Sequence, residues 1–145
     1  MTAKDYLKQL NDIDNLINLK LDSLQKINEL RLSVSAVAYD KPKVQATSDN
    51  NASFTQLTER EIELQNEINK LTDEYVDFQR KIESQFKLMK HSLYGRVLQK
   101  IYVNKKDAVV IGSELGYSPQ YVYECHLKAL DEFELMYSNE FEKIV

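Results

Sequence analysis

A chain of 145 residues has room for one ordinary domain, or for a helical stalk with a very small head. Its 43% of hydrophobic residues argues against wholesale disorder, and 3 Gly and 2 Pro are too few for the many turns of a β-rich protein. The net charge of −4 argues mildly against nucleic-acid binding by the chain as a whole. Long helices with few breaks are the predicted building blocks.

The compartment follows from what the sequence lacks. Cys125 is the single cysteine, so no internal disulfide can form. No run of 18 apolar residues exists, and the polar opening of the chain is unlike a signal peptide. We therefore expect a cytoplasmic protein that has no membrane partner.

Residues 1–90 are predicted to form a helical hairpin, with a loop at about residues 38–53. The first helix begins near Thr2, and apolar residues recur along it at alternating steps of three and four. The second helix begins near Thr55 or Thr58 and has the clearer heptad pattern. Its predicted seam consists of Leu57, Leu64, Ile68, Leu71, Tyr75, Phe78, Ile82 and Met89. Pro42 and the polar run that follows it predict the loop, so the helices should fold back antiparallel.

Several large apolar residues of the hairpin lie off its seam. They are Leu19, Leu21, Leu32, Phe86 and Leu88. Exposed apolar surface of this extent favours self-association, so the hairpin is predicted to form a homodimer. Packing of the same residues on the C-terminal part of the chain is the alternative.

Residues 91–145 are predicted to form a small head of short helices with an acidic tail. Asp107 is predicted to cap a helix that ends at Gly116. Ser118 and Pro119 then start the last helix, because proline at the first helical position needs no hydrogen-bond partner for its nitrogen.

The head has the spacing of a helix-turn-helix. Such a motif needs an inward aliphatic residue, a small residue where the second helix crosses closely, a turn residue that tolerates positive φ, and buried residues one turn apart in the second helix. A glycine inside a helix is destabilising by about 0.5–1 kcal/mol relative to alanine, and a close helix crossing would explain Gly112. The predicted motif core is Ile111, Gly112, Leu115, Gly116, Val122 and Cys125.

The segment 110–118, with the sequence VIGSELGYS, resembles the C-terminal head of a family of small phage-encoded regulators, as do Val122 and the segment 126–130, HLKAL. Those regulators resemble region four of bacterial sigma factors and are similar to phage late-transcription activators. The opening residues and the long hairpin are similar to the family as well. The resemblance implies a protein of Gram-positive phages or related mobile elements that binds promoter DNA, with host RNA polymerase as a candidate second partner.

The first turns of a recognition helix reach the base edges of the major groove. The candidate base-contacting residues are Gln120, Tyr121, Tyr123 and Glu124. Residues 90–106 carry five basic side chains and no acidic one, which is typical of a phosphate-contacting surface. The candidate phosphate contacts are Lys100, Lys105, Lys106, Ser118 and Lys128.

One departure from the family weakens the resemblance. Its members tend to carry arginine on the recognition helix, whereas this chain has Gln120 and Glu124. A carboxylate can accept a hydrogen bond from cytosine, but it repels phosphate. A protein-interaction module that binds RNA polymerase or another regulator, and a phage DNA-packaging recognition subunit, are therefore the alternatives to a transcription regulator.

No glycine-rich phosphate loop and no Cys/His metal spacing is present in the sequence. We therefore expect no enzyme, no cofactor, no metal and no small-molecule substrate. Double-stranded DNA is the predicted partner.

Overall fold

A computed structural model describes the backbone of residues 1–40 and 48–145, and the side chains outside residues 35–51. Its elements are α1 (Ala3–Asp40), α2 (Ser48–Lys87), α3 (Ser92–Leu98), the π-helix η2 (Gln99–Val103), α4 (Ala108–Leu115), α5 (Pro119–Tyr137) and the 3-10 turn η3 (Ser138–Glu140). The described residues contain no β-strand, which confirms the all-α prediction. None of the described helices has an apolar stretch long enough to cross a bilayer.

The chain divides into two compact units. One consists of residues 1–14 and 74–145, and the other of residues 15–73. Because α1 and α2 both cross the boundary, each unit contains part of the long helix pair. We call the first the head unit and the second the hairpin unit.

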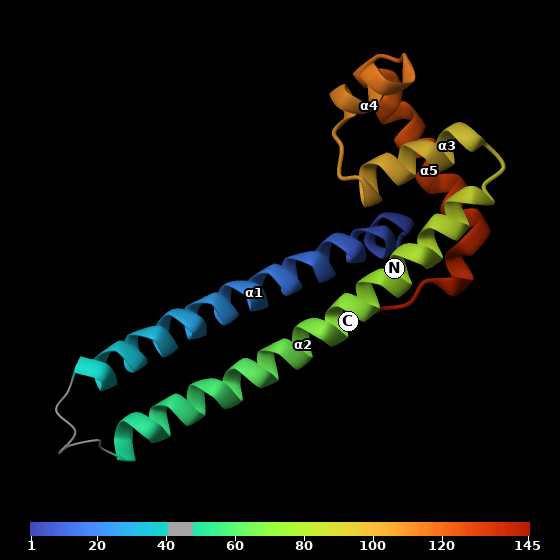
Figure 1. Cartoon of the computed structure of the whole chain (residues 1–145). Coiled ribbons are helices and arrows are strands. Elements are labelled where there is room, and N and C mark those ends of the chain that lie inside the picture. The colour runs from blue at the N-terminus through green and yellow to red at the C-terminus, as the bar shows by residue number, and fades with distance from the viewer. Residues whose placement is uncertain (41–47) are drawn as a thin grey trace. The chain divides into compact units, whose positions relative to one another are not determined.

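The hairpin unit is an antiparallel pair of helices, which Figure 1 shows running side by side. Ile27 and Ile68 are buried between polar outer faces. The Lys20 ammonium lies 2.8 Å from a carboxylate oxygen of Glu67. Farther along the pair, Arg31 binds Glu61. These two ion pairs join the two helices, and the predicted long N-terminal helix pair is confirmed.

Both long helices extend into the range predicted as loop. Helix α1 continues to Asp40, and α2 already begins at Ser48, several residues before Thr55. Serine, aspartate and asparagine, which suggested a turn, are also the residue types that favour the start of a helix. Pro42, on which the loop prediction partly rested, lies outside the described residues.

Most of the leucines that the sequence analysis placed off the seam are exposed. Leu19 and Leu32 retain 63% and 72% of their accessible surface. Leu21 and Leu88 are exposed as well. Phe86 differs, because it is buried in the head unit with its ring 5.6 Å from that of Phe133. For this residue the alternative of packing on the C-terminal part of the chain is correct.

The head unit has an aromatic core that joins the two ends of the chain. Tyr6 of α1 stacks on Phe141 at 4.5 Å between ring centroids, and it meets Phe78 of α2 edge-on at 5.2 Å. Phe133 of α5 stacks near both Tyr6 and Phe141. Burying rings of this size contributes a few kcal/mol each, so the first turns of α1 are part of the head's core.

Helices α4 and α5 begin where the sequence predicts. The Asp107 side chain accepts a hydrogen bond from the Val110 N–H at 2.9 Å, and Ser118 accepts from the Tyr121 N–H at 3.2 Å. Pro119 is the first residue of α5. These cap predictions are confirmed, and they fix the start of α4 and of α5.

Candidate functional site

The turn between α4 and α5 packs closely on α4 at a single glycine, so the close approach predicted at Gly112 is made by the turn and not by helix α5 itself. A Cβ atom built on Gly112 would collide with the carbonyl oxygen of Tyr117, which is a backbone atom and cannot rotate away. Gly116 ends α4 in the left-handed region at φ 80°. The N–H groups of Gly116 and Tyr117 both donate to the Gly112 carbonyl at 2.9 Å. The turn into α5 is therefore folded tightly against α4.

The residues of the predicted motif core lie together. Ile111 of α4 forms one buried cluster with Val122 and Cys125 of α5 and with Val97 of α3. Leu115 packs against this cluster while remaining partly exposed. The contact with α3 holds the α4–α5 pair on the rest of the head unit.

The opposite side of the first turns of α5 is exposed. All four candidate base-contacting residues lie on it, namely Gln120, Tyr121, Tyr123 and Glu124. Tyr121 packs its ring 4.8 Å from that of Tyr117, and Leu127 is 65% exposed one turn farther on. This surface, which we call the α5 face, combines hydrogen-bonding groups with aromatic and aliphatic ones.

Three of the candidate phosphate-contacting lysines lie in ion pairs. Lys100 and Lys106 each place their ammonium group 2.5 Å from a different carboxylate oxygen of Glu114. Lys105 binds Asp14, at the end of the α1 segment in the head unit. Hydrogen bonds from Lys100 and then Lys106 lower the pKa of Glu114, so its carboxylate stays ionised at neutral pH.

The remaining two candidates are not held in this way. Ser118 is exposed at the start of α5, where its hydroxyl caps the helix. Lys128 is exposed on α5, and no ion pair is recorded for it within the part of the chain that the structure describes.

Lys105 has an unusual backbone conformation. Its φ is 56°, in the left-handed region, where a side chain costs about 1 kcal/mol relative to glycine. The conformation lets the Lys106 N–H donate to the Lys100 carbonyl at 2.9 Å and close the end of η2. The loop before α4 is thus fixed by backbone hydrogen bonds, and Lys105 and Lys106 project from it toward separate acids.

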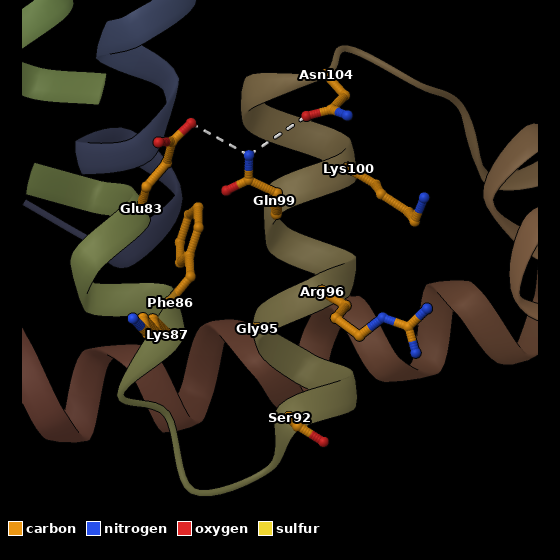
Figure 2. Close-up of a pocket in the computed structure, with 9 residues that line it drawn as sticks. All are labelled: Glu83, Phe86, Lys87, Ser92, Gly95, Arg96, Gln99, Lys100 and Asn104. Atoms are coloured by element: carbon orange, nitrogen blue, oxygen red, sulfur yellow. Dashed lines mark hydrogen bonds between the residues drawn. The ribbon is translucent and has the colours of Figure 1, made fainter. Parts of the chain in front are cut away.

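A groove of about 440 Å³ lies between the end of α2 and the α3–η2 segment. Phe86 and Gly95 line it, and the Gln99 amide spans from Glu83, at 3.3 Å, to Asn104. Figure 2 shows these polar groups on one side of the α3–η2 segment. The groove is open and holds groups of both charges.

Figure 2 also shows Arg96 and Lys100 one turn apart, extending away from Phe86 on the other side of the same segment. Arg96 is exposed. It belongs to the basic segment 90–106 but is not one of the candidate phosphate contacts, and it is more exposed than Lys100.

A half-buried histidine joins α5 to η2. The Tyr102 hydroxyl lies 2.8 Å from Nε2 of His126. Burial raises the pKa of Tyr102 to about 12, so the phenol keeps its proton at neutral pH. Burial first, and then the charge of Lys4, lower the pKa of His126. The neutral imidazole is therefore favoured, and its tautomer sets whether Nε2 accepts from the Tyr102 hydroxyl or donates to it.

Sequence reasoning did not single out the acids at this site. Glu114 is 14 residues from Lys100 and 8 from Lys106, and Asp14 is 91 residues from Lys105. No helical or strand period joins such positions, so the pairings depend on tertiary structure. The sequence shows the basic segment 90–106 as a run of positive charge, but it does not show that Glu114 and Asp14 pair with three of its lysines.

No family model matches the chain, and no curated protein and no solved structure matches it either.

Proposed function

We propose that the chain is a DNA-binding transcription regulator, in which α4 and α5 form a helix-turn-helix and α5 is the recognition helix. The observation that carries the proposal is the close approach at Gly112, which folds the turn against α4 and leaves the α5 face exposed. Gln120, Tyr121, Tyr123 and Glu124 would reach base edges in the major groove.

Phosphate contacts in this proposal come from the surface beside the α5 face. Ser118 would offer its backbone N–H at the start of the helix, where the helix dipole favours an anion. Lys128 and the lysines of the 100–106 segment would supply ammonium groups. The resemblance to sigma region four supports the same assignment and makes the protein a phage regulator that activates late genes in the bacterial cytoplasm. Such a role needs no catalysis and no cofactor.

A homodimer formed through the hairpin unit completes the proposal. It is supported by the exposure of Leu19 and Leu32, large apolar side chains on a helix whose other face is already used. Two copies of the head would then read two half-sites, and paired half-sites are the usual arrangement for dimeric helix-turn-helix proteins.

A protein-interaction module is a second candidate function, with host RNA polymerase or another regulator as its partner. One observation favours it: Tyr123 and Leu127 on the α5 face are 62% and 65% exposed, and three nearby lysines are already paired with acids. Aromatic anchors surrounded by neutralised charge are typical of protein interfaces.

The test is selection of bound sequences from a randomised DNA duplex library by the full-length chain. We expect a short preferred sequence to be enriched. Gln120→Ala should then change the base preference at one position of that sequence, because a side chain that reads a base edge contributes about 1–3 kcal/mol of discrimination there.

Gln65→Ala is the matched control, since Gln65 is an exposed glutamine of the hairpin unit. It should leave the preference unchanged. Recovery of no enriched sequence would overturn the DNA-binding proposal and favour the protein-interaction module. Equal weakening on every sequence by Gln120→Ala would remove Gln120 from the base-reading residues.

A further inference from the structure

Glu114 is the centre of a three-residue charge cluster on the proposed DNA-binding surface. Its two carboxylate oxygens each bind a different lysine, Lys100 from η2 and Lys106 from the loop before α4, both at 2.5 Å. The cluster is open to solvent, because each of the three side chains keeps between 20% and 33% of its accessible surface. A bound polyanion could therefore reach it.

A carboxylate and a phosphate compete for the same ammonium hydrogens. While Glu114 binds both lysines, two of the charges that would attract a duplex are cancelled at short range. Asp14 does the same for Lys105. Of the five basic residues in the 90–106 segment, only Lys90 and Arg96 are without a recorded ion pair in the described part of the chain.

Resting on the proposed function, we propose that Glu114 and Asp14 are specificity-determining residues. They act as internal counter-ions that keep Lys100, Lys105 and Lys106 from binding the phosphates of a loosely held duplex. The lysines are released to phosphate only when a duplex docks closely on the α5 face.

The physical reason is the short range of the competition. A duplex bound without base contacts is held by its phosphates alone and keeps no fixed register on the protein. Its phosphates cannot replace an ion pair at contact distance. A duplex whose bases fit the α5 face brings phosphate oxygens to contact distance, where they can replace the carboxylate. The acids therefore weaken sequence-independent binding more than sequence-specific binding.

The experiment compares the full-length wild-type chain with Glu114→Gln and Asp14→Asn. Fluorescence anisotropy would measure their affinity for two labelled duplexes, the selected sequence and a scrambled one of equal length, across about 50–200 mM salt. We expect Glu114→Gln to bind the scrambled duplex about 3–10-fold more tightly at low salt. The salt slope should rise by about 2, because two more lysines release counterions. Asp14→Asn should raise the slope by about 1.

Affinity for the selected duplex should rise less, so that the specificity ratio falls in both variants. Asp131→Asn is the matched control, because it removes one negative charge from an exposed acid of α5 for which no ion pair is recorded among the described residues. Glu114→Asp, which keeps the charge, should have the same affinities and salt slopes as the wild type. Melting curves would verify that each variant is folded.

The outcomes distinguish the specificity role of Glu114 and Asp14 from the DNA-binding proposal on which it rests. Equal gains on both duplexes, or a gain in Asp131→Asn that matches the one in Glu114→Gln, would overturn the specificity role while the DNA-binding proposal stands. Unchanged affinity in both Glu114→Gln and Asp14→Asn would do the same. Failure of the wild type and every variant to bind either duplex would overturn both claims.

Discussion

His126 is the residue of the head whose protonation should be most sensitive to its surroundings. It is half-buried, its Nε2 lies 2.8 Å from the Tyr102 hydroxyl, and it has the charge of Lys4 nearby. Both burial and that charge disfavour the imidazolium, so its pKa is below the usual 6.5. The unfolded chain takes up the proton more readily, and stability from this site is lost as the pH falls below 6.5.

We therefore expect the melting temperature of the wild type to fall between about pH 7.5 and pH 5. His126→Gln, whose amide can still form a hydrogen bond with the Tyr102 hydroxyl but does not titrate, should lose less over that range. The measurement is circular dichroism against temperature at each pH. His91→Gln is the comparison variant, since His91 is the other histidine of the chain and its exposed ring lies 2.5 Å from the Glu132 carboxylate. Parallel losses in wild type and His126→Gln would mean that other groups carry the pH dependence.

Lys105 illustrates a residue whose identity is not explained by local structure. Its left-handed backbone would be adopted more readily by glycine, yet a lysine stands there and binds Asp14. A side chain retained at a strained position suggests that its charge is used. The proposed function uses the charge of Lys105 to bind a phosphate, and the specificity proposal uses its ion pair with Asp14.

At the scale of the element, the fold of the turn between α4 and α5 depends on Gly112, because glycine has no side chain to collide with the turn. Gly112→Ala would place a Cβ against the Tyr117 carbonyl oxygen. Alanine favours the helix by about 0.5–1 kcal/mol, but overpacking against backbone costs about 1–3 kcal/mol. We expect a net loss of stability in the head unit, measured by chemical unfolding with near-ultraviolet circular dichroism of its tyrosines.

Ser113→Ala is the control for this substitution, since Ser113 is the exposed neighbour of Gly112 in the same helix. It should change stability by less than about 0.5 kcal/mol. If Gly112→Ala were as stable as the wild type, α4 and the turn would not approach as closely as described, and the motif proposed for DNA binding would lose its basis.

For the whole molecule, the proposed homodimer is the property most open to direct test. Sedimentation equilibrium should give a mass that rises with concentration toward that of two chains. Leu19→Lys combined with Leu32→Lys should shift the equilibrium to monomer without loss of helicity, because both side chains are exposed in the single chain. The cost of placing charges in an apolar interface accounts for the shift.

Leu135→Lys is the comparison variant, since Leu135 is 87% exposed on α5 of the head unit. It should leave the mass unchanged if the interface is in the hairpin unit. A wild type that stays monomeric at high concentration, or a dimer that survives both hairpin substitutions, would contradict the proposal.

Much of the fold was accessible from local patterns. Heptad spacing predicted the two long helices, and Asp107, Ser118 and Pro119 predicted where α4 and α5 begin. These features depend on hydrogen bonds and periods within a few residues, which a single sequence contains. The exposure of the α5 face follows from the same helical period, once Val122 and Cys125 are taken as buried.

Tertiary structure alone decided which distant residues meet. Tyr6 packs into the aromatic core of the head, and Gly95 is a glycine because a Cβ there would lie 2.5 Å from the Phe86 carbonyl oxygen. The pairing of Glu114 with two lysines is of the same kind. Such contacts arise from how helices pack, and packing depends on side-chain shapes far apart in the chain, which no local period encodes. The sequence determined the helices and the starts of α4 and α5; their packing determined which charges on the candidate surface are already paired.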